Sequence, residues 1–187
     1  MVGNDIVDLE EAKKASNWKR PRFLDKLFTS KEQQLIHNSK NAFLMVWRLW
    51  TMKEAAYKLY TQLHPSRFYN PKGFECFIDN GNGTVRFKDF HCHTKTQIES
   101  KYIVSEARLT EAKMTSKVIK FKENSSSEKQ GNLIKNRVLH ALSKLNKVPV
   151  AHLIFKKSEF GIPAVHFNSE TIEISMSHHG CFGAYAI

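Results

Sequence analysis

The sequence predicts an α+β fold in which antiparallel sheets pack against helices. Short segments with strand character and longer segments with helical spacing follow one another in a mixed order, and turn-forming residues separate several of the strands. The chain has 187 residues, of which 41% are hydrophobic and 25% are charged. This composition is typical of a globular protein and excludes a disordered or fibrous chain.

Three elements are expected in the first third of the chain. Residues 2–9 are predicted to form a short, largely apolar strand. A helix is expected to begin near Thr29, because Thr29 and Glu32 stand three residues apart as in a capping box. Residues 42–60 show the strongest helical pattern, with a stripe of apolar residues at i, i+3, i+4 and i+7: Phe43, Val46, Trp47 and Trp50.

Strands are expected to predominate from the end of this helix to residue 121. Residues 74–78 and 84–87 flank a predicted hairpin turn at 80–83, where Asn and Gly accept positive φ angles. Residues 101–109 and 117–121 are predicted to add two more strands. Residues 123–131 contain a run of serines and resemble a linker, so the main boundary is expected there.

One helix and four strands are predicted after the linker. The helix has an apolar side that runs from Leu133 to Leu145. The strands are expected at residues 153–155, 164–167, 171–176 and 182–187, with a turn at 177–180 between the last two. The predicted organisation is therefore a lobe of residues 1–122, a linker of residues 123–131 and a segment of residues 132–187.

Positive charge is in clear excess. The 29 Lys and Arg residues exceed the 18 Asp and Glu residues, and the resulting formal charge of +11 favours an anionic partner such as nucleic acid, a phosphate-rich cofactor or an acidic protein. The longest apolar run, residues 42–47, is far shorter than the roughly 20 residues of a membrane-spanning helix. Residues 1–11 are acidic, unlike a secretory signal. We expect a cytoplasmic protein without a membrane partner.

The apolar stripe of the 42–60 helix continues onto Glu54 and Lys58, which lie at helical spacing from Trp50. A buried, unpaired charge is costly, so Glu54 needs a cation, a metal or water beside it. The ordinary explanation is an i, i+4 ion pair with Lys58, worth ~0.2–0.5 kcal/mol. Asp5 supports a different explanation, because it too lies on a strand face that is otherwise apolar.

Two carboxylates on separate elements, completed by water and phosphate oxygens, are typical of a Mg²⁺ site. Lys53 and Lys58 lie beside Glu54 and are suited to neutralise a phosphoryl group. The residues alone therefore suggest a magnesium-dependent phosphate site, with Asp5 and Glu54 as candidate metal ligands.

Several segments resemble the signature of the 4'-phosphopantetheinyl transferases, in order and approximate spacing. GNDIVD at residues 3–8, FTSKE at 28–32 and WTMKEAAYK at 50–58 carry the resemblance, and the last of these is the most specific. FGIP at residues 160–163 and ISMSHHG at 174–180 are similar to the G-K-P and S-H-x-G segments of the family. The resemblance extends over nearly the whole chain.

The resemblance implies a family-like fold and transfer of the phosphopantetheine group of coenzyme A to a serine of an apo acyl or peptidyl carrier protein, an acidic partner. By position, Asp5 and Glu54 would bind Mg²⁺, and Lys53 and Lys58 would contact phosphates and act in catalysis. Gly161, Pro163, Ser177 and His178 would contact coenzyme A. The general base would be Glu54 or a metal-bound water.

The chain departs from the family pattern at two positions. Larger, two-lobed members have a second acid two residues after the aspartate, where this chain has Val7; Asp8 follows but points to the opposite strand face. Ile162 replaces the common Lys of G-K-P, and Lys129 or Lys135 would have to compensate for the lost charge.

The order of the motifs leaves two arrangements open. In two-lobed members the G-K-P and S-H-x-G segments come before the aspartate strand, whereas here they come last. The chain would then be either a circularly permuted, two-lobed monomer or a short protomer whose active site forms between the subunits of a homo-oligomer.

Two further signals receive less weight. His91-Cys92-His93 lacks a second ligand pair at zinc spacing and is interpreted as part of a polar strand. The segment Trp18 to Arg22 is basic and aromatic, so it suits a nucleic-acid contact, an acceptor-docking patch or a solvated loop. The alternative to the transferase is a non-catalytic binding domain of the same fold, for nucleic acid or protein, with nucleic acid the less favoured partner.

Overall fold

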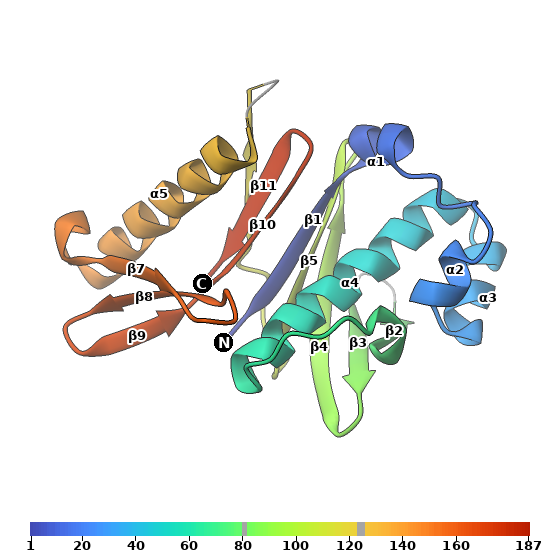
Figure 1. Cartoon of the computed structure of the whole chain (residues 1–187), viewed down its shortest axis with the longest axis horizontal. Helices are drawn as coiled ribbons and strands as arrows, with labels where there is room; N and C mark the ends of the chain where they lie inside the picture. Colours follow the sequence, from blue (N-terminus) through green and yellow to red (C-terminus); the bar gives the residue numbers. More distant parts are fainter. Residues whose placement is uncertain (80–81, 123–125) are drawn as a thin grey trace.

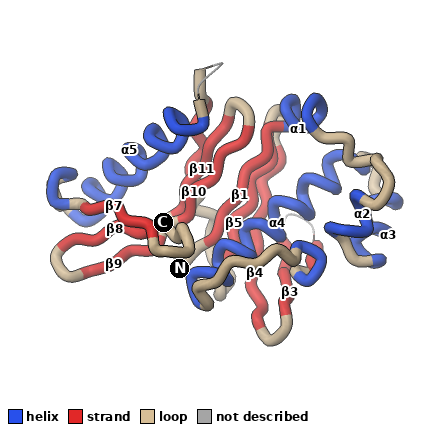
Figure 2. Tube along the Cα trace, in the orientation of Figure 1, coloured by secondary structure: helices blue, strands red, loops and turns tan. Residues whose placement is uncertain are grey.

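The computed structural model describes residues 1–79, 82–122 and 126–187. Among these residues the strands form one five-stranded sheet and two three-stranded sheets, in which neighbouring strands are antiparallel. Helices pack on the sheets, as Figures 1 and 2 show. The predicted α+β class with antiparallel sheets is confirmed.

The five-stranded sheet is the centre of the N-terminal region, which we define as residues 1–109. Its strand order is β1 (Gly3–Asp8), β5 (Tyr102–Arg108), β4 (Phe90–Ile98), β3 (Asn82–Phe87) and β2 (Glu75–Asp79). Asn80 and Gly81 of the predicted hairpin turn lie outside the described residues, but the two strands that they join pair as expected. His91 and His93 lie on β4, as the strand interpretation requires.

Helix α4 (Ala42–Leu63) lies across one face of this sheet and contacts β1 and β5 most extensively. Asn41 caps its first turn by accepting a hydrogen bond from the Leu44 N–H at 3.1 Å. The predicted stripe is only partly right, because Phe43 and Trp50 are half-buried. The most deeply buried residues form a neighbouring face turned towards the sheet: Leu49, Met52, Ala55, Ala56 and Leu59.

Three short helices and a 3₁₀ turn pack beside α4 and β1: α1 (Leu9–Ala15), α2 (Phe23–Leu27), α3 (Ser30–Asn38) and η1 (Pro71–Gly73). The capping box predicted at the start of α3 is present. The Thr29 N–H donates to the Glu32 carboxylate at 2.7 Å, and the Glu32 N–H donates to the Thr29 hydroxyl at 3.3 Å.

The C-terminal region, residues 116–187, has its own core. Strand β6 (Lys117–Lys120) pairs with β11 (Phe182–Ala186), which pairs with β10 (Ser175–His179). The second small sheet contains β7 (Ile154–Lys157), β8 (Pro163–Phe167) and β9 (Glu170–Glu173), preceded by the 3₁₀ turn η2 (Val150–His152). Helix α5 (Ser127–Asn146) packs against β11 and β10 with its apolar residues Ile134, Val138 and Leu142.

Two sequence expectations need revision here. The single strand predicted at residues 171–176 is interrupted at Ile174, and its two halves belong to different sheets, because Ile174 is fully buried where the chain crosses between them. The turn predicted at 177–180 begins later, since β10 continues to His179. Within the expected linker, residues 123–125 lie outside the description and α5 begins at Ser127. The division at 123–131 stays a prediction.

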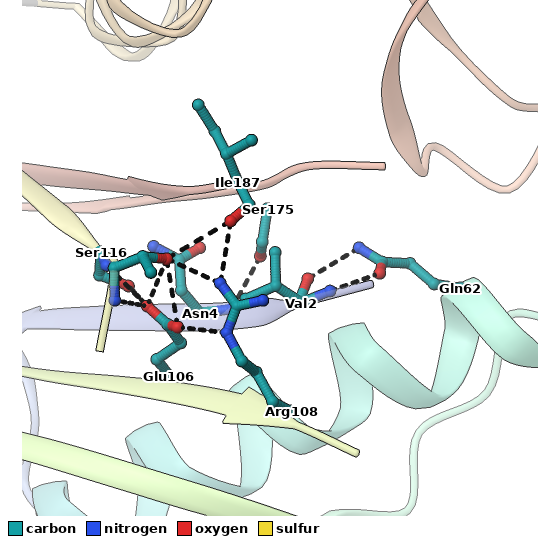
Figure 3. A network of polar contacts seen from close by, with 9 residues as sticks. Val2, Asn4, Gln62, Glu106, Arg108, Ser116, Ser175 and Ile187 are labelled. Carbon is teal, nitrogen blue, oxygen red and sulfur yellow. Dashed lines mark hydrogen bonds and ion pairs between the residues drawn. The ribbon is translucent and has the colours of Figure 1, made fainter. Parts of the chain in front are cut away.

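The two regions meet where β1 lies beside β10. The Asn4 N–H donates to the Ser175 hydroxyl at 2.8 Å, and the Asp8 N–H donates to His179 Nδ1 at 3.1 Å. Gln62 of α4 forms hydrogen bonds with both backbone groups of Val2 (Figure 3). It also donates to the Ile174 carbonyl oxygen. Side chains thus satisfy the edge of β1 that faces away from β5.

A second junction lies near the last residue. The Glu106 carboxylate, 3% exposed, accepts hydrogen bonds from Ser116 and from the Thr115 N–H and forms an ion pair with Arg108 at 2.7 Å. Arg108 also donates to the Ile187 carbonyl oxygen at 2.9 Å (Figure 3). These contacts fix the chain before β6 and the end of β11 to β5, and so hold the two regions in one orientation.

Candidate active site

Asp5 lies on the face of β1 that packs against α4. Gly3, on the same face, approaches α4 so closely that a Cβ atom there would collide with the Ala55 carbonyl oxygen. This approach brings Asp5 to the next turn of α4, where its Oδ1 forms an ion pair with Lys58 Nζ at 2.8 Å. The side chains of Asp5 and Lys58 remain 14% and 28% exposed, respectively. The pair is therefore held rigidly but remains in contact with solvent.

Lys58 is bound by β1 rather than by its own helix. Besides Asp5, its ammonium donates to the Asn4 carbonyl oxygen at 2.9 Å. Among the described contacts it makes no ion pair with Glu54, so the local i, i+4 pair is not the interaction that forms. The tertiary pair between helix and strand takes its place.

The ionised form of the Glu54 carboxyl group is disfavoured by its surroundings. Burial, and secondly the charge of Asp5, raise its pKa from 4.5 to about 7, while the charge of Lys58 acts in the opposite direction. Within the described ranges, its carboxylate accepts no hydrogen bond and joins no ion pair. Asp5 and Glu54 are therefore close enough to repel each other, as the predicted shared site requires.

The donor set fits a hard divalent cation. Two neighbouring carboxylates, one of them without a hydrogen-bond partner among the described residues, provide oxygen ligands of the kind that Mg²⁺ prefers, and a cation would remove the repulsion that raises the pKa of Glu54. In the described part of the chain, no group of three or more His, Cys, Asp or Glu side chains is arranged to hold a metal ion. Water and substrate oxygens would have to complete the coordination.

A pocket of about 190 Å³ opens beside Lys58 and joins the two regions. Lys58 and Gln62 line it from α4, Gly161 from the loop before β8, Pro163 from the first position of β8, and Met176 from β10. Gly161 has a φ of +83°, which favours glycine, and Arg67 donates to the Glu159 carbonyl oxygen at 3.0 Å. The segment that contains the predicted residues Gly161 and Pro163 is thus held against the end of α4.

Ser177 and His178 differ in their placement. Ser177 is 6% exposed and belongs to the face of β10 that bonds to β1 through Ser175 and His179; Ser175 lines the pocket, whereas Ser177 is not among its lining residues. His178 is exposed on the other face. Partial burial lowers its pKa, and the charges of Lys58, His179 and Lys157 lower it further. His178 is therefore close enough to Lys58 for that charge to act on it, and its contact with coenzyme A stays a prediction.

Lys53 does not join this group. Its ammonium is 1% exposed, forms an ion pair with Glu32 at 2.7 Å and donates to the Phe74 carbonyl oxygen at 2.6 Å. The direct phosphate contact predicted for Lys53 does not fit this placement, because both of these partners would have to be given up. Sequence spacing could not show this, since the partners come from α3 and the segment before β2.

Two further pockets lie along α4 on the side of Glu54. A pocket of about 270 Å³ is lined by Glu54, Tyr57 and Tyr69, and a pocket of about 480 Å³ shares Trp50 and Tyr69 with it. The larger pocket also contains Arg20 and Pro21 of the basic segment singled out in the sequence. Tyr69 is 76% exposed. Partial burial raises the pKa of the Tyr69 hydroxyl, and the nearby charge of Glu54 raises it further. The sequence offered no signal for Tyr69.

Residues 1–114 match the sequence model of the 4'-phosphopantetheinyl transferase superfamily. This match covers more than half of the chain. The chain belongs to this superfamily. The resemblance inferred from the motifs is confirmed.

Individual relatives match over a shorter part of the chain or at lower sequence identity. A holo-acyl-carrier-protein synthase of Caldanaerobacter subterraneus subsp. tengcongensis is 36% identical over 58 residues, which is 31% of this chain and 45% of that protein. The chain thus spans less than half the length of this relative.

Two solved structures are also similar. The Thermotoga maritima holo-acyl-carrier-protein synthase has a TM-score of 0.46 at 18% identity, with 91% of this chain and 83% of that chain covered. The apo-ACPS structure from "Chronobacterium ammoiniagenes" has a TM-score of 0.48 at 17% identity, with 57% of this chain and 93% of that chain covered.

Val7 and Asp8 explain how this superfamily member departs from its two-lobed relatives. Val7 is 2% exposed in the core between β1 and α4, so an acid at that position would be buried among apolar side chains at a high cost. Asp8 caps α1 by accepting from the Glu10 and Glu11 N–H groups, and its other oxygen accepts from the Cys181 N–H at 2.8 Å. Asp8 is therefore a structural link between β1 and the turn after β10.

No helix within the described residues has the length and apolar character needed to cross a bilayer.

Proposed function

We propose that this chain transfers the 4'-phosphopantetheine group of coenzyme A to a serine hydroxyl of an apo acyl or peptidyl carrier protein, with Mg²⁺, and releases adenosine 3',5'-bisphosphate. Superfamily membership supports the reaction class. The observation that carries the proposal is the Asp5–Lys58 ion pair beside Glu54, at a pocket that Gly161 and Pro163 complete.

The chemistry needs little from the protein beyond charge and position. The acceptor serine oxygen forms a bond to the pantetheine-bearing phosphorus, the bond to the bridging oxygen breaks, and that oxygen leaves on adenosine 3',5'-bisphosphate. The nucleophile belongs to the partner, so the chain requires groups that hold the diphosphate and balance its charge. Lys58 would supply positive charge, His178 would offer a ring N–H as a hydrogen-bond donor, and Asp5 and Glu54 would hold a Mg²⁺ ion that neutralises the reacting phosphoryl oxygens.

The proton of the acceptor hydroxyl must also be removed. The base would be Glu54 or a metal-bound water; Glu54 has a pKa of about 7 without a metal, and a bound Mg²⁺ would lower this pKa, which would make Glu54 the weaker base. The Lys58 ammonium donates to Asp5 and to a backbone carbonyl oxygen, and it is suited to stabilise the phosphoryl group.

The basic segment of residues 18–22 supports an acidic protein as the acceptor. Arg20 and Pro21 line the large pocket that adjoins, through Trp50 and Tyr69, the pocket containing Glu54. A carrier protein docked there would present its serine on the Glu54 side of α4, while coenzyme A would enter from the Lys58 side. Electrostatic attraction between the basic segment and an acidic carrier would speed the encounter.

The arrangement within the chain bears on the two quaternary alternatives. Lys58 and the segment of Gly161 and Pro163 line the same pocket within one chain. This placement supports a site built by a single chain. We therefore favour the two-lobed arrangement over a site shared between subunits.

The decisive test is whether an apo carrier protein gains the mass of phosphopantetheine when mixed with the protein, coenzyme A and Mg²⁺. We expect the gain with the wild type and its loss with Glu54→Gln, while circular dichroism and thermal unfolding show that the variant folds. The control Glu170→Gln changes an exposed glutamate of β9 and should keep the activity. No mass gain by the wild type with any carrier would favour the non-catalytic binding domain instead.

A further inference from the structure

The pocket beside Lys58 is poor in positive charge for the donor that we propose. Among the described residues that line it, Lys58 is the one with a charged side chain, and Ile162 contributes an apolar group where a cation would be useful. Coenzyme A carries a diphosphate and a separate phosphate on its ribose. Lys58 is already paired with Asp5, so a further cation is needed to hold the ribose phosphate.

The two lysines considered from the sequence do not meet this need. Lys135 lies over the Phe155 ring, with its ammonium 5.1 Å from the ring centroid, and Lys129 is exposed in the first turn of α5. Like Lys157, neither residue is among the residues that line the pocket, but unlike Lys157 neither belongs to a strand that pairs with one of those residues.

Lys157, at the end of β7, is placed differently. In the register of β7 with β8 it stands directly opposite Pro163, a residue that lines the pocket. Directly opposed residues of an antiparallel pair direct their side chains to the same face. Phe155, two residues earlier on that face, packs against the core of the C-terminal region. The exposed Lys157 therefore continues the inner face of the sheet to the edge of the pocket.

His178 marks the same place from another strand. Lys157 and Lys58 both act electrostatically on its imidazole, so the three side chains, from β7, α4 and β10, lie near one another. Lys58 is held at the Asp5 end, where the reacting diphosphate must lie, and Lys157 enters from the Pro163 end. The phosphate left for Lys157 is the one that does not react.

We propose that Lys157 binds the ribose 3'-phosphate of coenzyme A and thereby sets the preference of this site for coenzyme A over 3'-dephospho-coenzyme A. This inference rests on the proposed function. Lys157 is here a specificity residue, because its target phosphate is remote from the bonds that form and break.

The neighbouring Lys156 provides a matched control. It stands opposite Ala164, so its side chain lies on the other face of the same sheet. Lys156→Gln and Lys157→Gln remove the same charge from adjacent exposed positions. A general loss of positive potential would affect both variants equally, whereas a direct phosphate contact affects only Lys157.

The test compares kcat/KM for coenzyme A and for 3'-dephospho-coenzyme A in the wild type and in both variants. For Lys157→Gln we expect kcat/KM for coenzyme A to fall about 10- to 100-fold, the range for losing a hydrogen bond to a charged group, mainly through KM. The value for the dephospho form should change little, so the preference should collapse. Lys156→Gln should keep the wild-type preference, and Lys157→Arg should retain most of it.

Calorimetric binding of adenosine 3',5'-bisphosphate and of adenosine 5'-phosphate separates this inference from the proposed function. We expect the wild type to bind the bisphosphate more tightly, and Lys157→Gln to bind the two alike. An active wild type whose preference is unchanged by Lys157→Gln, or whose kcat/KM falls equally for both donors, would overturn the role of Lys157 alone. A wild type that neither binds coenzyme A nor transfers its phosphopantetheine would overturn the proposed function itself.

Discussion

Helix α4 carries two lysine–carboxylate pairs that look alike in the sequence motif and differ in the structure. Lys53 pairs with Glu32 at 2.7 Å, and both side chains are at most 1% exposed. Lys58 pairs with Asp5 at 2.8 Å, with 28% and 14% of the side chains exposed. The first pair closes the core between α4 and α3, whereas the second borders a pocket.

The difference follows from the position of each lysine around the helix. Five residues correspond to about 140° of rotation about the helix axis, so Lys53 and Lys58 point to different neighbours. Glu32 is fully engaged, because its oxygens also accept from the Thr29 and Cys76 N–H groups. The Lys53 pair is therefore a fixed structural element, while the Lys58 pair can exchange its partner for a phosphate or a metal-bound group. The same residue types serve stability in one place and binding in the other.

The largest effect should come from breaking the buried pair. Lys53→Met leaves the Glu32 carboxylate buried without its cation, and we expect the free energy of unfolding to fall by roughly 3–5 kcal/mol. Urea unfolding followed by circular dichroism measures the change. The double variant Lys53→Met with Glu32→Gln removes both charges and should recover part of the loss. If Lys53→Met unfolds like the wild type but loses transfer activity, the structural assignment of Lys53 is wrong.

For the Asp5–Lys58 pair at the pocket, we expect a large loss of activity and a small loss of stability. Lys58→Met removes positive charge from the phosphate site, and we expect phosphopantetheine transfer to fall about 10²- to 10³-fold, as for the loss of one transition-state stabilising group. The free energy of unfolding should change by only about 1 kcal/mol or less, because the Asp5–Lys58 pair is partly solvated. A large loss of stability in this variant would contradict the contrast between the two pairs.

The smallest of the three effects concerns Glu54, which lies on α4 between the two lysines. Its pKa of about 7 in the folded chain exceeds the value of 4.5 for the free group, so the folded state binds this proton more tightly. The free energy of unfolding should therefore fall as the pH rises from about 4.5 to about 7, by at most about 3 kcal/mol from this group.

Urea unfolding of the wild type and of Glu54→Gln at about pH 5 and about pH 8 isolates this contribution. The wild type should lose stability relative to the variant at the higher pH, and saturating Mg²⁺ should restore much of it by binding the deprotonated pair. An identical pH dependence of the two proteins would show that Glu54 has an ordinary pKa.

Only part of the candidate site could be predicted from the sequence. The apolar strand and the helix stripe predicted that Asp5 and Glu54 occupy apolar surroundings, and the pKa of Glu54 agrees with their proximity. Glu32 was explained by its capping box alone, although it is also the partner of Lys53. Tyr69 and Lys157 carry no motif, because they reach the site through a loop and a strand register that no local spacing reveals.

The sequence by itself determined the α+β class, the helix that carries Glu54 and Lys58, the strand that carries Asp5, and membership of the superfamily, because each of these depends on local periodicity or on a contiguous motif. Only the tertiary structure decided which lysine is buried and which borders the pocket, and that Gly161 and Pro163 come to Lys58. Those outcomes depend on how β1 and β10 lie side by side and on which face of α4 meets α3. Such contacts join residues far apart in the chain. Their energy comes from burial and from interactions between charges, and the local sequence around each residue does not show which groups will meet.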